Sequence, residues 1–179
     1  MDRLLKWIKY IFVGLTIFVV IEKFIFGLTI VQGMSMQPTL HNHDKLFVNK
    51  IAYFLENPHH GDIVIFNPPI DERKDELFIK RVIAVEGDEF SIQEGKLYIN
   101  GKEIEESYIQ HENYEERFYE VTKGQVPKGM VFVMGDNRND SNDSRCFGFV
   151  PKKNIKGKAN IRIWPMDAIQ TFSNTEKTN

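Results

Sequence analysis

The sequence is poor in cysteine: Cys146 is the only one among 179 residues. A single cysteine cannot form a disulfide within the chain, and it cannot supply a four-cysteine zinc site. The fold must therefore rest on an ordinary hydrophobic core. A chain of this length that is 42% apolar has enough material for one such core, together with an anchoring segment.

The sequence also lacks an excess of positive charge, with 23 Lys and Arg against 25 Asp and Glu. The formal net charge is -2 at pH 7, and four basic residues stand against two acidic ones in the first 23 positions. The remainder of the chain is therefore more acidic than the whole, and it offers no broad basic face for a phosphate backbone. This balance argues against nucleic acid as a partner.

The sequence lacks a recognisable metal motif. No His-Glu-x-x-His pattern is present, although residues 41–44 could place two imidazoles on one strand face, which keeps a metal site open as an alternative. Histidines beside Asn and Pro in turns are mostly solvated, so we expect neither a bound metal nor a cofactor. The five histidines are His41, His43, His59, His60 and His111.

One long apolar segment stands near the N-terminus. Residues 7–31 hold only three charges in 25 positions. At about 1.5 Å of rise per residue, a helix over roughly residues 4–26 would cross a hydrocarbon core of about 30 Å. The uninterrupted part, residues 10–21, would also suit a buried helix or a cleavable secretion signal. No small-x-small site follows it, which favours an uncleaved membrane anchor.

Three basic residues at positions 3–9 precede the apolar run. Positive charges next to a span stay on the cytoplasmic side, which predicts that residues 1–6 are cytoplasmic. Residues 32–172 would then form one extracytoplasmic domain in a single-pass protein. The composition of residues 173–179 predicts a flexible tail.

Beyond residue 44 the sequence is typical of β structure. Short β-branched and aromatic runs alternate with Gly, Pro and Asn, and no long stretch keeps a helical period. Glu94-Gly95 and Asn100-Gly101 predict two hairpin turns in a meander. We therefore expect a mainly β fold. Its predicted strands are residues 45–49, 62–66, 77–85, 89–93, 96–100, 102–104, 130–134 and 158–164.

An acidic insert occupies residues 103–120. It holds seven glutamates and one arginine, together with the aromatic residues Tyr108, Tyr114, Phe118 and Tyr119. Glutamates are rarely buried unless they are paired, so we expect a solvated insert with an aromatic underside.

Ser35 stands in a proline-containing turn, residues 33–40, directly after the apolar segment. Serine near Gly and Pro is commonly a turn former, because its hydroxyl can bond to the local backbone. It can also be a nucleophile if a neighbouring group accepts its proton. Histidine is the usual base, but none of the five stands in a recognisable setting.

Lys80 interrupts the apolar run of residues 77–85. Strand alternation places it on the same face as Phe78 and Val82, while Arg81 lies on the opposite face. Burial disfavours the ammonium form, and a lysine that loses its proton near neutral pH can act as a base. The alternative is an edge lysine that keeps the strand from pairing. Alternation alone favours neither.

A polar loop, residues 135–145, follows the apolar run at 130–134. It combines three aspartates, two arginines and two serines in a span too short for a linker. Such a loop can be a surface loop of Asx turns, or it can be a polar network that braces a site.

Four runs of the sequence stand out together: SMQPTL at 35–40, GDIVIF at 61–66, KRVIAVEGD at 80–88 and GDNRNDSNDSRCFG at 135–148. In order and spacing they resemble the extracytoplasmic boxes of the bacterial type I signal peptidases. The short chain and single anchor are similar to the Gram-positive branch. The resemblance implies coiled antiparallel β-sheets whose catalytic face lies against the membrane.

The resemblance also implies a Ser-Lys dyad, with Ser35 as nucleophile and Lys80 as general base. Ser141 matches the family's hydroxyl that orients the lysine. The backbone N–H of Ser35 would hold the oxyanion, because Gly33 stands where some members have a serine side-chain donor. The residues that match the family's supporting network are Asp136, Arg138, Asp143 and Arg145.

The implied function is a membrane-bound serine endopeptidase that removes signal peptides from secreted preproteins after small-x-small sites. An autocleaving repressor-type protein also uses Ser and Lys on a related fold, but the chain has no DNA-binding domain or Ala-Gly cleavage site. A catalytically silent, membrane-anchored binding domain is the other alternative. The residues expected to keep the catalytic surface against lipid are Phe24, Ile25, Phe26, Met34 and Met36.

Overall fold

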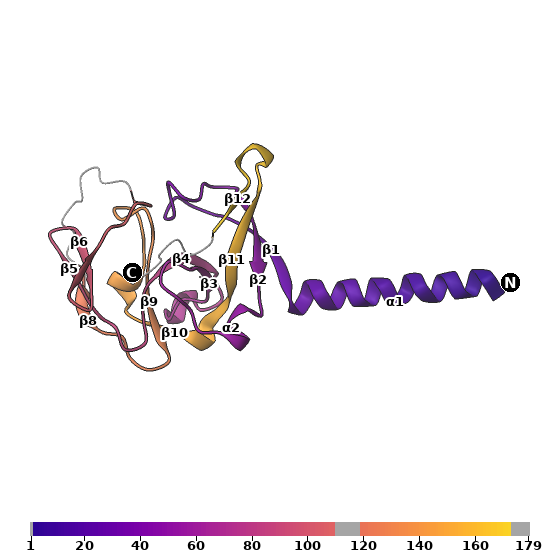
Figure 1. The fold of residues 1–179 in the computed structure, drawn as a ribbon, viewed down its shortest axis with the longest axis horizontal. Helices are drawn as coiled ribbons and strands as arrows, with labels where there is room; N and C mark the ends of the chain where they lie inside the picture. The colour runs from indigo at the N-terminus through magenta and orange to yellow at the C-terminus, as the bar shows by residue number, and fades with distance from the viewer. Residues whose placement is uncertain (1, 110–118, 173–179) are drawn as a thin grey trace.

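The computed structural model describes residues 2–109 and 119–172 as one long helix joined to a β body (Figure 1). Helix α1 (Asp2–Phe24) projects away from that body, and its apolar side chains are not covered by the rest of the chain. Among the described residues it is the one helix that is long and apolar enough to cross a membrane. The predicted tail, residues 173–179, lies outside the described residues.

The larger sheet contains eight antiparallel strands. Its order is β1-β2-β11-β3-β4-β9-β10, and β12 pairs with β11. The bounds are β1 (Phe26–Ile30), β2 (Lys45–Asn49), β3 (Ile63–Phe66), β4 (Phe78–Val85), β9 (Met130–Met134), β10 (Val150–Pro151), β11 (Ile155–Trp164) and β12 (Gln170–Thr171).

The smaller sheet has four strands in the order β7-β6-β5-β8. Both predicted hairpins are present: φ is 50° and 76° at Glu94 and Gly95, and 52° and 79° at Asn100 and Gly101. Two successive positive φ values are what a type I′ turn requires. The bounds are β5 (Glu89–Gln93), β6 (Lys96–Ile99), β7 (Lys102–Ile104) and β8 (Lys123–Gln125).

Short helices occupy several of the connections. The α-helical ones are α2 (Ala52–Leu55) and α3 (Ser144–Phe147), and the 3₁₀ turns are η1 (Asp71–Arg73), η2 (Lys152–Asn154) and η3 (Met166–Ala168).

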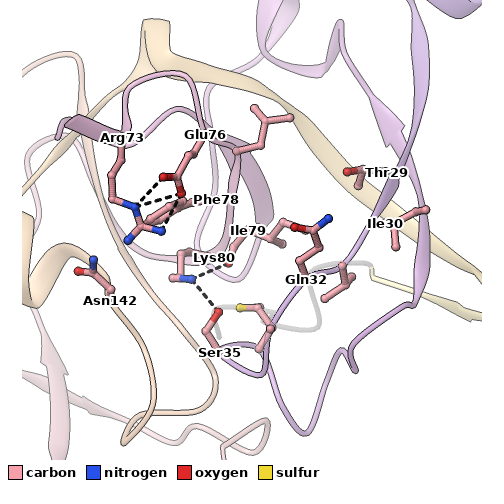
Figure 2. A pocket seen from close by; sticks show the side chains of 14 residues that line it. Thr29, Ile30, Gln32, Ser35, Arg73, Glu76, Phe78, Ile79, Lys80 and Asn142 are labelled. Carbon is pink, nitrogen blue, oxygen red and sulfur yellow. Dashed lines mark hydrogen bonds and ion pairs between the residues drawn. The ribbon is translucent and has the colours of Figure 1, made fainter. Parts of the chain in front are cut away.

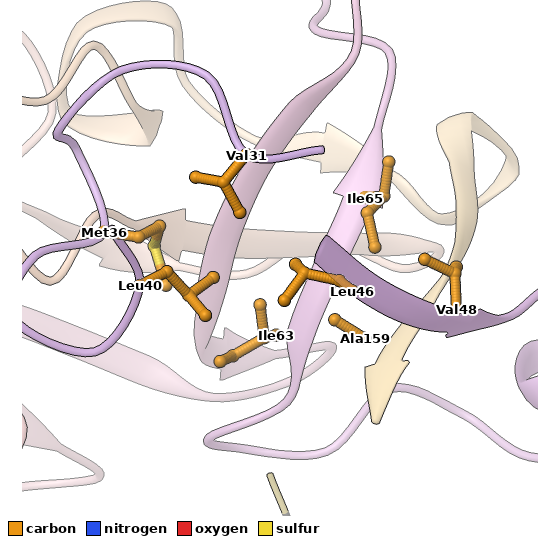
Figure 3. Close-up of a cluster of buried hydrophobic side chains, with 8 residues drawn as sticks. All are labelled: Val31, Met36, Leu40, Leu46, Val48, Ile63, Ile65 and Ala159. Atoms are coloured by element: carbon orange, nitrogen blue, oxygen red, sulfur yellow. The ribbon is translucent and has the colours of Figure 1, made fainter. Parts of the chain in front are cut away.

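Apolar side chains join the two sheets and fasten the turn that carries Ser35. Phe90 of β5 stacks on Phe132 of β9 with ring centroids 4.1 Å apart. Met36 and Leu40 belong to a second cluster under the turn (Figure 3). Met36 is only 2% exposed, so the expectation that it faces the bilayer was wrong. The other members of this second cluster are Val31, Leu46, Val48, Ile63, Ile65 and Ala159.

Strand β11 curls the large sheet. Its ladders with β2 and β3 contain register shifts, which bend a strand and increase its twist. Gly157 permits a close approach, because a Cβ there would lie 2.7 Å from the carbonyl oxygen of Asn49. β1 ends the sheet on one side, and the β4–β9 ladder begins only at Arg81 and Met134. The β1 edge and the first residues of β4 are therefore both open to another strand.

The eight predicted strands are all present, and β2, β5, β7 and β9 have the predicted bounds. The segment predicted as anchor, residues 7–31, is divided: α1 ends at Phe24, and Phe26–Ile30 form β1 against β2. An apolar composition alone does not distinguish a lipid-facing helix from a strand with an apolar face. The other strands that sequence reasoning missed, β8, β10 and β12, have only two or three residues.

Candidate active site

A cleft of about 640 Å³ lies between β1 and the first residues of β4. One side is formed by residues 29–36 and the other by residues 76–80, with Arg73 and Asn142 beside them (Figure 2). Ser35 and Lys80 point toward each other within it. The described residues that line the cleft include no histidine.

Hydrogen bonds hold the turn that presents Ser35. The Ser35 carbonyl accepts from the Asn137 N–H at 3.0 Å, and the Met34 carbonyl accepts from the Gln37 N–H at 3.1 Å. Asn137 Nδ2 also donates to Met34, at 3.2 Å. Gly33 has a φ of 91°, which only glycine adopts without strain. The loop after β9 thus fixes the Ser35 turn through the two hydrogen bonds of Asn137.

Lys80 makes the decisive contact. Its Nζ donates to Ser35 Oγ at 2.8 Å and to the Ile79 carbonyl at 3.1 Å. Burial lowers the pKa of Lys80 to about 8; the Asp143 carboxylate opposes that fall, and the positive charge of Arg73 adds to it. A lysine amine with a pKa this low is partly neutral near pH 7, and the neutral form can take a proton from a hydroxyl.

The position of Lys80 in the sheet answers the question that alternation left open. Lys80 lies in the part of β4 that pairs with β3 alone, opposite Val64, but its side chain is 5% exposed and its amine is bonded to Ser35. The interpretation of Lys80 as a solvent-exposed edge lysine is therefore wrong. The amine also lies 5.3 Å from the centroid of the Phe78 ring, whose apolar surface helps to exclude water.

The backbone N–H of Ser35 is available to a ligand. Within residues 2–109 and 119–172 it donates to no acceptor. Gly33, two positions earlier, is exposed and brings no side chain to the cleft. One main-chain donor is therefore in place beside the Ser35 hydroxyl, whereas the Gly33 N–H is bonded to Asn42 at 3.1 Å.

Asp136 is paired with Arg81, on the far side of β4 from Lys80. Arg81 Nε donates to Asp136 Oδ1 at 2.8 Å and Nη2 donates to Oδ2 at 2.6 Å. Arg81 Nη1 reaches the Gly61 carbonyl at 3.0 Å, and Thr39 Oγ1 donates to Asp136 at 2.5 Å. This bidentate pair and its hydrogen bonds to Gly61 and Thr39 tie all four motif runs together. The sequence placed Arg81 on the opposite face but gave no signal of its partner.

Asp143 and Arg145 form a second pair with no exposed surface. Arg145 donates to both carboxylate oxygens, at 2.9 and 2.8 Å, and Gly135 N–H donates to Asp143 at 3.0 Å. Burial alone would raise the pKa of the Asp143 carboxyl, but these hydrogen bonds hold it below its usual value. Arg145 Nη2 also donates to the Arg138 carbonyl at 2.9 Å, so the pair fastens the loop at two points.

Arg138 extends this network to the acidic insert. Its Nε donates to the Gly135 carbonyl at 3.1 Å, and its guanidinium pairs with both oxygens of Glu106. Glu106 is 3% exposed and accepts from the Tyr108 hydroxyl at 2.6 Å. The expectation of a solvated insert was therefore wrong at Glu106, because a buried arginine needs a buried counter-ion. Residues 110–118, with Tyr114 and Phe118, lie outside the described residues.

Ser141 and Ser35 both lie against Gly135. A Cβ built on Gly135 would collide with both Ser141 Oγ and the Ser35 carbonyl, so glycine lets these groups approach. The Ser141 hydroxyl is buried and has no hydrogen-bond partner at ordinary distance and angle among the described residues. Its expected hydrogen bond to Lys80 is not formed in this conformation, in which Lys80 donates to Ser35 and Ile79.

The histidines do not gather. His60 Nε2 lies 2.7 Å from Asp88 at the surface, and His59 is near Asp62. His41 and His43 are exposed, and His111 falls outside the described residues. In the part of the chain that the structure describes, no group of three or more His, Cys, Asp and Glu side chains could hold a metal ion.

Sequence reasoning did not predict that Arg73, Glu76 and Asn142 line the cleft. Arg73 donates to Glu76 through Nε at 3.0 Å and Nη2 at 2.7 Å, and its guanidinium lies 4.6 Å from the centroid of Phe78. Asn142 belongs to the polar loop and lines the same cleft as Lys80 of β4 (Figure 2). The charged run at 71–76 signals a loop, but nothing in it indicates that the loop folds over a cleft.

Comparisons with known proteins point to one family. The family model described as signal peptidase, peptidase S26, matches residues 4–164. The chain is 36% identical to signal peptidase I P of Bacillus subtilis subsp. natto, over 94% of each protein. It is 33% identical to signal peptidase IB of Staphylococcus aureus, over 98% of this chain and 97% of that protein.

A solved structure is also similar. The crystal structure of a signal peptidase I from Enterococcus faecalis V583 matches with a TM-score of 0.50 and 35% sequence identity. The match covers 59% of this chain and 98% of that one.

Proposed function

The chain belongs to the type I signal peptidases of family S26, serine endopeptidases that remove signal peptides, and we propose that Ser35 and Lys80 are its catalytic dyad. The observation that supports this assignment is the 2.8 Å hydrogen bond between Lys80 Nζ and Ser35 Oγ. It joins the hydroxyl of a fixed turn to an amine whose pKa burial lowers to about 8. Nucleophile and base are thus within reach of each other before substrate arrives.

Acylation follows from this contact. The neutral Lys80 amine takes the proton of the Ser35 hydroxyl while Oγ attacks the scissile carbonyl carbon. The Ser35 N–H donates to the oxyanion that forms. As the C–N bond breaks, Lys80 returns the proton to the departing amine, which is the new N-terminus of the mature protein.

Deacylation uses the same groups. The departure of the mature protein leaves the signal peptide as an ester on Ser35 and the lysine neutral. Lys80 takes a proton from a water molecule, whose oxygen attacks the ester carbonyl, and gives that proton to Ser35 Oγ when the C–O bond breaks. The enzyme is then restored.

The two open strand edges provide a place for the substrate. An extended segment of the preprotein can lie between β1 and the first residues of β4, making main-chain hydrogen bonds with their edges. In an extended segment, the first and third residues before the cut point to the same side. There they would meet apolar residues of the cleft, such as Val31, Met36 and Ile79. We propose that these residues accept the small side chains of the cleavage site.

The polar loop would hold this geometry. We assign Asp136, through Arg81, to the bracing of β4, and the remaining loop residues to the support of the Ser35 turn. Ser141 would orient Lys80 once the hydrogen bond between Lys80 and Ser35 Oγ is released during the reaction. The members of the loop network are Arg138, Ser141, Asp143 and Arg145.

The single N-terminal apolar helix is consistent with a membrane anchor. The predicted span of roughly residues 4–26 is shortened by the structure, in which α1 ends at Phe24 and Phe26 belongs to β1. We propose that the span ends with α1, with the N-terminus cytoplasmic and residues 32–172 extracytoplasmic. Leu28, Ile30 and Met34 are large, apolar and exposed next to the cleft. Signal peptides are themselves apolar, so a cleft held at the bilayer surface by these side chains would meet its substrate there.

The test uses the full-length enzyme in liposomes with a signal-peptide-bearing preprotein. Ser35→Ala and Lys80→Ala are each expected to abolish release of the mature protein, while both variants keep the wild-type circular dichroism spectrum. Lys123→Met, which removes an exposed lysine of β8, serves as the matched control. Near-normal cleavage by either dyad variant would contradict the assignment.

A further inference from the structure

The C-terminal end of α1 is held by a lysine from the β body. Lys50 Nζ donates to the Glu22 carbonyl at 2.9 Å and to the Lys23 carbonyl at 3.1 Å. Carbonyls in the last turn of a helix have no partner within the helix, and a cation placed there is favoured by the helix dipole. The usual source is a lysine of the helix itself. Here the lysine comes from outside the helix: Lys50 directly follows β2, and both β1 and β2 lie between it and the end of α1.

Gly27 makes room for this side chain. A Cβ at Gly27 would lie 2.6 Å from Lys50 Cε and 3.1 Å from Nζ. Any larger residue at position 27 would therefore displace the lysine from the helix end. The obstacle is a flexible side chain, so the strand itself could accept alanine without a backbone clash.

The main chain around Lys50 is fixed. Its N–H donates to the Ile25 carbonyl at 2.9 Å, and the preceding residue, Asn49, pairs with Phe26 at the start of the β1–β2 ladder. β1 then runs to Ile30, and Ser35 follows five residues later. The lysine thus links the helix to the strand that leads directly into the nucleophile.

We propose that Lys50 is a positioning residue that fixes α1 relative to the cleft, so that a signal peptide in the same bilayer reaches Ser35 in register. This inference rests on the proposed dyad and anchor. It concerns only the geometry between helix and cleft, and it assigns Lys50 no role in the chemistry. A substrate that reaches the cleft from solution does not depend on that geometry.

The activity test compares two substrates for the full-length enzyme. One is a preprotein inserted in the same liposomes; the other is a short soluble peptide with the same cleavage site, assayed in detergent. Lys50→Met and Gly27→Ala are expected to cleave the soluble peptide at the wild-type rate. Preprotein processing should fall by roughly tenfold or more, because a misplacement of about 1 Å can cost 10²-fold in rate.

The controls separate this inference from the dyad itself. Lys50→Arg keeps a cationic donor and is expected to retain most of the preprotein activity. Lys123→Met removes the same charge from the small sheet and should match wild type on both substrates. If the dyad assignment holds, Ser35→Ala should lose both activities, and this result does not depend on the role of Lys50.

A spectroscopic readout measures the geometry directly. In a background with Cys146 replaced by Ser, spin labels at Ile17→Cys in α1 and Lys156→Cys in β11 report the distance between anchor and body. The distance distribution is expected to be narrow in the wild type and broad in the Lys50→Met and Gly27→Ala variants. An unchanged distribution in Lys50→Met would overturn the proposal. So would an equal loss on both substrates, or a Lys50→Arg variant as slow as Lys50→Met.

Discussion

Arg73 and Lys80 contact the same phenyl ring: the Arg73 guanidinium carbon lies 4.6 Å, and the Lys80 amine 5.3 Å, from the centroid of Phe78. Two cations on one ring are separated by no more than about 10 Å, which is the screening length at 0.1 M salt. Glu76 holds Arg73 there with bonds of 2.7 to 3.0 Å. A surface residue is thus coupled to the buried base.

Replacing Arg73 is expected to shift the pH dependence of cleavage. Arg73 adds to the lowering of the pKa of Lys80 that burial causes, so Arg73→Gln should raise that pKa. The midpoint of the rate against pH should move upward, with a fall in rate at pH 7 and an unchanged plateau at high pH. The shift should shrink as salt is added. Glu76→Gln keeps the positive charge and should not move the midpoint upward; the same upward shift in both variants would contradict this account.

The wild-type rate is expected to rise with pH through a value near 8. The base is the neutral amine, and burial places the pKa of Lys80 at about 8. The measurement is kcat/KM on a soluble peptide from pH 6 to 10. A rate that does not depend on pH between 7 and 9 would argue against a lysine base.

The same lysine is expected to reduce the stability of the folded protein at neutral pH. Its pKa is about 8 when folded and 10.5 in the unfolded chain, so below pH 8 both states are protonated and the fold carries the full cost of the buried charge. That cost is about 3 kcal/mol, and it disappears as pH rises from 8 to 10.5. Lys80→Met should therefore be more stable than wild type at pH 7, and the difference should vanish near pH 10.5 in denaturant titrations.

Ser141→Ala should separate activity from stability. The Ser141 hydroxyl makes no hydrogen bond of ordinary geometry among the described residues, and its interaction with Asp143 is weaker than those of Arg145 and Gly135, so its removal should cost only about 1 kcal/mol of stability. The rate should fall by about 10²-fold or more if the hydroxyl orients the base. Ser144→Ala is the matched control: Ser144 Oγ accepts from the Val133 N–H at 3.0 Å, and leaving that donor unpaired should cost about 1–3 kcal/mol. A full-rate Ser141→Ala enzyme would remove Ser141 from the mechanism.

Glu106→Gln is expected to destabilise the protein by about 3 kcal/mol, because it leaves Arg138 buried without a counter-ion. Glu103→Gln removes another glutamate of the same insert, one that pairs with Lys96 at the surface at 3.0 Å, and should cost less than about 1 kcal/mol. Equal effects in chemical denaturation would show that Glu106 is not a buried counter-ion.

The hairpins and most strands could be predicted because their signals are local. Asn100-Gly101 adopts the two positive φ values that its residue types favour, and the strands at 45–49 and 130–134 are short runs centred on Phe and Val, which favour strands. Ser35 and Lys80 were predicted differently, from four motif runs taken together, because the local setting of each residue also suits a structural role. A sequence pattern could not show that residues 26–30 form a strand and are not part of the anchor helix, since the helix and this strand are both rich in apolar residues.

The sequence by itself determined the strand pattern and the apolar helix, because each depends on neighbours within a few positions. It singled out Ser35 and Lys80 as candidates only through the resemblance of four separated runs to a known family. Only the tertiary structure decided that the Lys80 side chain is buried, that Arg81 pairs with Asp136, and that Glu106 is buried against Arg138. These outcomes depend on burial and on the approach of charges from distant segments. The pKa of Lys80 is such an outcome: no local pattern encodes it, because burial by distant segments and the charges of Asp143 and Arg73 set it together.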